Sequence, residues 1–122
     1  MRVIARDIDW STVPADVRPF ISPTQTCLAA GETYDVFAVS VYRKVVFFLV
    51  ADASGTPTFL PEWLFHVVDS SVRSDWTCNV SMGHELDLVL GPTFVASDLD
   101  AYNSLVDLEP AAVEHFRRYV RG

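Results

Sequence analysis

The run Val45-Val46-Phe47-Phe48-Leu49-Val50-Ala51 is the longest apolar stretch of the chain. Its seven residues are mostly β-branched or aromatic, and they fall far short of the roughly 20 residues that a helix needs to span a bilayer. No polar residue interrupts the run, so neither face of the corresponding strand can be a solvated one. The run therefore predicts a strand that is covered on both faces and is central in its sheet.

The flanking segments predict further antiparallel strands. Upstream, side chains alternate with a period of two from Thr33 to Tyr42, which is typical of a half-buried strand. Downstream, the turn-forming residues 52–57 predict a hairpin loop, in which Gly55 can take positive φ. Five or six short strands in succession predict a curled antiparallel sheet or a partly open small barrel. The remaining strands are expected at Thr58–Leu60, Phe65–Asp69, Trp76–Val80 and Glu85–Leu90.

The two ends of the chain have different patterns. Residues 1–31 contain prolines, serines and threonines among scattered apolar anchors, which predicts an irregular arm. Residues 97–121 have helical periodicity, with Ser97 and Asp100 in a capping-box spacing and Pro110 at the start of a second helix. We therefore expect a single α+β domain over residues 1–122, with the arm (1–31), an antiparallel β region (32–91) and two short C-terminal helices (97–121).

Composition favours a folded cytoplasmic protein. Of the 122 residues, 50% are hydrophobic, and the mean hydropathy is +0.22, which excludes the signature of a disordered chain. Charge at Arg2 and Arg6 interrupts the start before the apolar core of a signal peptide could form, so we expect a cytoplasmic location. In that reducing compartment, Cys27 and Cys78 are expected to be buried thiols rather than a disulfide.

Acidic side chains are concentrated between Val45 and Phe116. This segment contains eleven acidic residues and a single basic residue, Arg73, so its formal charge is −10. The whole chain has a formal charge of −7. Such a surface repels nucleic acid and anionic lipid and attracts basic partners. We therefore expect a partner with a basic surface, and binding of neither nucleic acid nor membrane.

The patterns required for catalysis or metal binding are mostly missing. The cysteines and histidines form none of the close pairs by which a structural zinc site is recognised. Cys78 lacks the surroundings of a catalytic nucleophile. Glu85 and Asp87, two positions apart on a predicted strand, share a face and could act as acid and base, but such a pair is more often solvated or in contact with a partner. We expect no enzyme activity, no metal and no cofactor.

Carboxylates and tryptophans in the predicted strands and turns are the candidate contact residues. Aromatic side chains beside carboxylates suit the centre and rim of a protein interface. Local structure alone also accounts for Asp98 and Asp100, because acidic residues favour helix starts. The candidates for partner binding are Glu62, Trp63, Asp69, Asp75, Glu85, Asp87, Asp98 and Asp100.

A longer pattern resembles a known class of proteins. Residues 52–76 read D-x-S-G-x-P-x-F-x-P-x-x-L-F-x-V-V-D-S-x-x-x-x-x-W. With the flanking sequence over about residues 31–106, this stretch resembles small bacterial immunity proteins of contact-dependent growth inhibition and other polymorphic toxin loci. The matched positions are turn and core residues, so the resemblance assigns no binding residue.

The resemblance implies a function that agrees with the charge. It implies an immunity protein that binds a cognate toxin domain, of the basic nuclease type, and neutralises it by occluding its active surface. Two alternatives remain open. One is a small-molecule or peptide-binding module that uses the mouth of the curled sheet, with Trp63 and Trp76 as walls. The other is an interaction domain unrelated to toxins.

Overall fold

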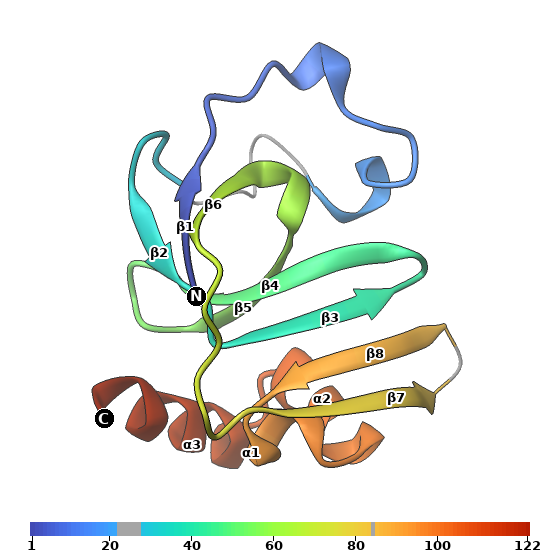
Figure 1. The fold of residues 1–122 in the computed structure, drawn as a ribbon, viewed down its shortest axis with the longest axis vertical. Coiled ribbons are helices and arrows are strands. Elements are labelled where there is room, and N and C mark those ends of the chain that lie inside the picture. Colours follow the sequence, from blue (N-terminus) through green and yellow to red (C-terminus); the bar gives the residue numbers. More distant parts are fainter. Residues whose placement is uncertain (22–27, 84) are drawn as a thin grey trace.

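Two antiparallel sheets and a layer of helices make up the fold (Figure 1). The structure is a computed structural model, and it describes residues 1–21, 28–83 and 85–122. The larger sheet has five strands in the order β5-β4-β3-β8-β7, and the smaller sheet has three in the order β2-β1-β6. The strands are β1 (Arg2–Ala5), β2 (Thr33–Asp35), β3 (Ala38–Tyr42), β4 (Val45–Ala51), β5 (Pro57–Pro61), β6 (Phe65–Asp69), β7 (Thr77–Gly83) and β8 (Leu86–Gly91). The helices are α1 (Thr93–Ala96), α2 (Leu99–Val106) and α3 (Pro110–Arg121), and the short 3-10 turns are η1 (Trp10–Thr12), η2 (Arg18–Phe20) and η3 (Glu62–Leu64).

The apolar run Val45–Ala51 forms β4, as expected. This strand lies between β3 and β5, so it is an interior strand, although the middle place in the sheet belongs to β3. Phe47 and Leu49 are buried on one face of β4, and Phe48 and Val50 are buried on the other, beneath the smaller sheet. The prediction of a strand covered on both faces is confirmed.

The sheets neither curl nor close, so the expected barrel is wrong. The cause lies in residues 33–42, which split into β2 and β3 instead of forming one strand. The Val36 N–H donates to the Met1 carbonyl at 2.9 Å, whereas the Phe37 N–H donates to the Leu49 carbonyl at 2.8 Å. Val36 and Phe37 are both buried, in different core clusters, so the alternation breaks between them. Two neighbouring residues thus serve two different sheets.

The N-terminal arm is less irregular than its sequence predicts. Residues 2–5 form β1, the middle strand of the smaller sheet, which pairs with β2 and β6. Val3 in this strand is fully buried. Further along the arm, Val13 and Val17 are buried against Val45 and Phe47 of β4. The arm is therefore part of the core rather than an appendage.

Three helices follow the sheets, rather than the expected two. The Asp98 carboxylate caps α2 by accepting the Ala101 N–H at 2.8 Å, whereas Ser97 ends the unpredicted helix α1. The last helix begins at Pro110 as expected, and its Phe116 is fully buried. Across the described residues, none of the helices is both long and apolar enough to cross a membrane.

The larger sheet is covered differently on its two faces. On one face the helices pack over a core that includes Leu49, Val89 and Phe116. On the other face the smaller sheet lies over β4, while β8 and β7 extend beyond it (Figure 1). This part of the larger sheet therefore has one face that the smaller sheet does not cover.

Candidate interaction surface

The uncovered part of the larger sheet presents adjoining apolar side chains. The strand register places Val41 opposite Leu88, and Leu88 opposite Val80. The same register places Val39 opposite Leu90. Residues directly opposite one another in neighbouring strands project from the same face of a sheet. We name this surface the open sheet face, and its members are Val39, Val41, Val46, Cys78, Val80, Leu88 and Leu90.

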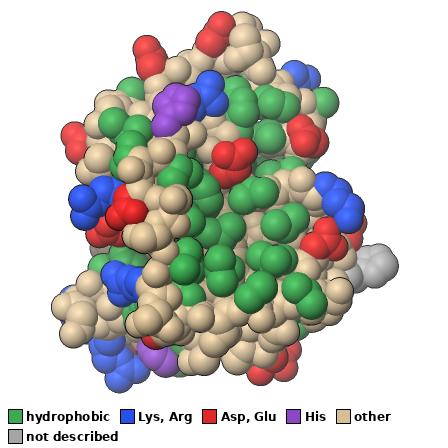
Figure 2. All heavy atoms as spheres, in the orientation of Figure 1, with side chains coloured by type: hydrophobic (Ala, Val, Ile, Leu, Met, Phe, Trp, Pro, Cys, Tyr) green, Lys and Arg blue, Asp and Glu red, His purple; other side chains and the backbone are tan. Residues whose placement is uncertain are grey.

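The open sheet face is accessible to a partner. The Val80 side chain is 62% exposed, Cys78 is exposed, and the other members are half-buried. Val39 and Val46 lie at the edge of this face, where they also pack against the core beneath the smaller sheet. Figure 2 shows hydrophobic side chains gathered over β4, β3, β8 and β7 on this side of the molecule. Strand β7 is also an edge strand, which leaves one row of its backbone groups outside the sheet. A contiguous apolar surface of this kind is a candidate for contact with another molecule.

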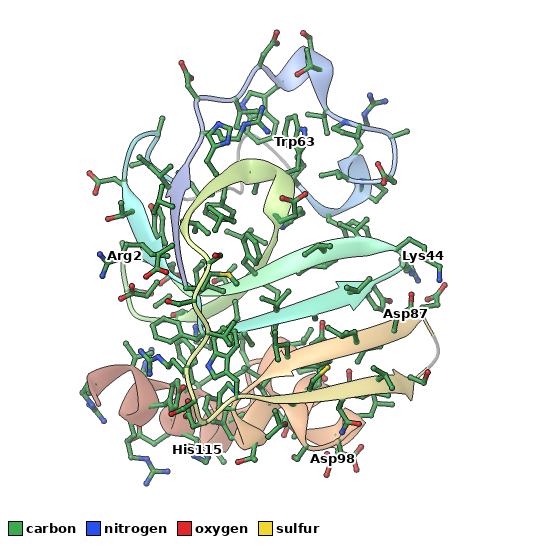
Figure 3. The ribbon with its side chains drawn as sticks, in the orientation of Figure 1. Arg2, Lys44, Trp63, Asp87, Asp98 and His115 are labelled. Atoms are coloured by element: carbon green, nitrogen blue, oxygen red, sulfur yellow. The ribbon has the colours of Figure 1, made fainter. Side chains whose placement is uncertain are left out.

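Two ion pairs lie at one end of the open sheet face. Arg43 Nε lies 2.9 Å from Glu85 Oε2, and Lys44 Nζ lies 2.9 Å from Asp87 Oδ2. Arg43 and Lys44 are the two central residues of the β3–β4 turn, and both have positive φ, at 50° and 65°. Positive φ at both positions is the geometry of the hairpin turn that follows the twist of the strands. Figure 3 shows Lys44 beside Asp87 at the tips of the two hairpins.

The ion pairs change the interpretation of the two carboxylates. Glu85 lies before β8 with a φ of 69°, so the prediction that it stands with Asp87 on one strand is wrong. The Glu85 carboxylate accepts a hydrogen bond from Arg43 Nε, and this bond raises the pKa of the Arg43 guanidinium above its usual value. The acidic segment begins one residue after Lys44, so its charge count left out both cations that the fold brings to it. At this end of the sheet the local charge is therefore balanced.

Three other candidate carboxylates are also engaged within the chain. Asp69 accepts hydrogen bonds from the Ser71 hydroxyl at 2.7 Å and the Ser71 N–H at 3.0 Å, which lower the pKa of Asp69. Asp75 accepts a hydrogen bond from the Tyr119 hydroxyl at 3.0 Å. Asp98 caps α2. Each of these acids therefore has a structural role that needs no partner protein.

The eight candidate residues do not form one surface. Figure 3 places Trp63 beside the N-terminal arm, Asp87 at the hairpin tips and Asp98 in the helical layer. Glu62 belongs to η3 with Trp63, and Asp100 belongs to α2. Of the eight, Glu85 and Asp87 are the two that lie at the end of the open sheet face. The sequence-based candidates thus include two charged residues at the end of the open sheet face and none of its apolar members.

Because the sheets are not curled, the structure has no mouth with Trp63 and Trp76 as its walls, which the small-molecule or peptide-binding alternative requires. Trp63 is half-buried, and the Arg6 guanidinium carbon lies 4.9 Å from the centre of its ring. Trp76 packs against the core between the two sheets, and its buried indole N–H has no hydrogen-bond partner among the described residues. Both tryptophan side chains therefore pack within the fold.

Cys78 is exposed on β7, so the expectation that it is a buried thiol is wrong. The strand register places Cys78 opposite Leu90, on the open sheet face. The expectation for Cys27 lies outside the described residues. Within the described residues, no three His, Cys, Asp or Glu side chains are grouped so that they could hold a metal ion.

Comparison with protein-family models, curated proteins and solved structures finds no match to this chain. The functional interpretation therefore rests on the open sheet face, on its balanced rim and on the net charge.

Proposed function

We propose that the chain is an immunity protein that binds a basic, nuclease-type toxin domain and neutralises it by covering its active surface. The observation that supports this proposal is the open sheet face, an apolar surface with no charged member and with charged side chains at its end. Protein interfaces commonly have this anatomy, in which charge is depleted at the centre and present at the rim. The resemblance of residues 31–106 to immunity proteins favours the same kind of partner.

The net charge and the open sheet face have separate roles in this proposal. A formal charge of −7 attracts a basic partner over distance and speeds encounter, and salt weakens this attraction. The carboxylates nearest the open sheet face are already paired with Arg43 and Lys44, so they add little charge at the contact itself. Burial of apolar side chains such as Val80 and Leu88 is then what slows dissociation.

Expression together with the product of the adjacent upstream gene tests the proposal. That product is expected to be toxic alone, to be tolerated when this chain is present, and to co-purify with it. A toxic neighbour that this chain neither binds nor neutralises would refute the function. A bound but harmless neighbour would also refute it, and would favour an interaction domain unrelated to toxins.

Matched substitutions test the placement of the contact. Val80→Asp puts a charge at the centre of the open sheet face, at a side chain that is 62% exposed, so the fold should tolerate it. Val120→Asp makes the same change in net charge on α3, where the side chain is 37% exposed. We expect Val80→Asp to weaken binding of the toxin by about tenfold or more and Val120→Asp to leave it unchanged. Equal binding by the two variants would show that the toxin does not contact the open sheet face.

A further inference from the structure

A hollow of about 280 Å³ lies on the helix side of the larger sheet, opposite the open sheet face. Its floor is formed by Tyr42, Phe47 and Phe59, from the neighbouring strands β3, β4 and β5. One wall is α2, and the other wall is Phe20 of η2. The helices and the N-terminal arm both cover this face of the sheet, and the hollow lies in the gap between them.

Aromatic rings line most of the hollow and hold one another in place. The Phe20 ring stands edge-on to Phe47 with 5.1 Å between ring centres, and 6.2 Å from Tyr42. Across the floor, the rings of Phe59 and Tyr102 lie 5.1 Å apart. Such ring pairs add to the stability of a packed aromatic group beyond area burial. The lining is thus a set of aromatic rings that pack against one another.

The hollow is open to solvent along α2. Val106 lines it and is 47% exposed. A second hollow of about 250 Å³ shares Phe59 and Val106 with it and reaches Leu108, which is 46% exposed. A ligand can therefore enter beside Val106 without displacing a buried side chain.

Polar groups in the hollow are few, and they restrict the class of ligand. Among the described lining residues none is charged, so an ion would lose its hydration without compensation. The Tyr102 hydroxyl already pairs with Ser40 Oγ at 3.2 Å. The side-chain amide of Asn103 is exposed and makes no hydrogen bond within the described residues. An exposed amide beside several rings suits a flat, neutral molecule that carries one hydrogen-bonding group.

We propose that this hollow is a binding site for a neutral two-ring aromatic molecule, which packs among Phe47, Phe59 and Tyr102 and hydrogen-bonds to Asn103. An apolar cavity of about 150 Å³ accepts benzene, so a hollow of about 280 Å³ has room for a second fused ring. The site lies on the opposite face of the sheet from the open sheet face, and it does not depend on the proposed function.

Titration of the whole chain with indole, followed by NMR chemical shifts, tests the site. Indole is expected to bind saturably and to shift resonances of residues that line the hollow. Val106→Trp fills the hollow from its exposed edge and is expected to weaken indole binding by about tenfold or more. Val120→Trp makes the same substitution on α3, away from the hollow, and is expected to bind indole as the unaltered chain does. Absence of saturable binding, or equal binding by these two variants, would overturn the proposal.

A second ligand tests the role of Asn103. 1-Methylindole has the same rings as indole but no N–H to donate. Asn103→Leu is therefore expected to weaken binding of indole severalfold and to leave binding of 1-methylindole unchanged or stronger. If Asn103→Leu binds both ligands as the unaltered chain does, the assignment of the amide is wrong. Thermal melting of each variant shows whether a loss of binding is merely a loss of fold.

Discussion

Lys44 Nζ lies 2.9 Å from Asp87 Oδ2, although 43 positions separate the two residues. The contact joins the tips of two hairpins whose inner strands, β3 and β8, pair with one another. Both side chains are well exposed, at 85% and 45%. An exposed pair of this kind adds little stability, so its main effect is to balance a carboxylate beside the open sheet face.

A double-mutant cycle measures the strength of this pair. Lys44→Ala and Asp87→Ala, alone and combined, are expected to give a coupling energy of about 1 kcal/mol or less. Because both groups face solvent, the coupling should decrease as the salt concentration rises. Urea unfolding of the four proteins at low and high salt measures it. A coupling that salt does not change would show that the pair is more protected than its exposure indicates.

Substitutions at Asp98 separate its helix cap from its charge. Asp98→Ala removes the acceptor of the Ala101 N–H and is expected to lower the free energy of unfolding by about 1 kcal/mol. Asp98→Asn keeps an oxygen at that place, so its loss should be much smaller. Asp100→Asn is the control, because it removes the same charge from the first turn without touching the cap. If Asp98→Asn costs as much as Asp98→Ala in urea unfolding, charge rather than the hydrogen bond stabilises α2.

Local sequence patterns correctly predicted those elements that neighbouring residues alone determine. The uninterrupted apolar run predicted β4, and Pro110 marked the first residue of α3. The 52–57 turn is also as expected, since Asp52 accepts the N–H groups of Ser54 and Thr56 at 2.9 and 3.0 Å. In each of these cases, the residues that determine the structure lie within a few positions of one another.

The features that the sequence did not predict depend on pairing between strands that are far apart in the chain. Strand β1 is four residues long, and its place in a sheet follows from β2 and β6, which lie about 30 and 60 positions away. In a regular β8, Leu86 and Leu88 would lie on one face, because they are two positions apart. The register with β3 shifts between Val41 and Tyr42, so Leu86 packs under the helices while Leu88 joins the open sheet face. Alternation shows that a strand has an apolar face, but it cannot show which face a neighbouring element leaves uncovered.

Phe116 is expected to be among the most costly residues to truncate. Its ring is fully buried beneath the larger sheet, with its centre 5.4 Å from that of Phe37. Phe116→Ala should lower the free energy of unfolding by about 3 to 5 kcal/mol, because it leaves a cavity as well as removing apolar contact. Val120→Ala on the same helix, where the side chain is 37% exposed, should cost far less. Equal losses in urea unfolding would mean that α3 is not packed against the sheet as described.

The stability of the chain is expected to fall at alkaline pH because of Tyr102. Burial raises the pKa of its hydroxyl above the ordinary value of 10, and the hydrogen bond with Ser40 opposes this only in part. The folded state therefore favours the protonated phenol. The contribution of Tyr102 is complete below pH 10 and is lost as the pH rises through the higher pKa of the folded state.

Urea unfolding at about pH 8 and about pH 11, for the unaltered chain and for Tyr102→Phe, isolates this effect. The phenylalanine variant loses the hydroxyl and should be less stable at the lower pH, but its stability should fall less between the two conditions. Tyr34→Phe is the matched control, because Tyr34 is half-buried in the smaller sheet and has no hydrogen bond to Ser40. An identical alkaline loss in Tyr102→Phe and the unaltered chain would show that another group causes it. The two possibilities are thus distinguished by comparing the alkaline loss of stability in the variant with that in the unaltered chain.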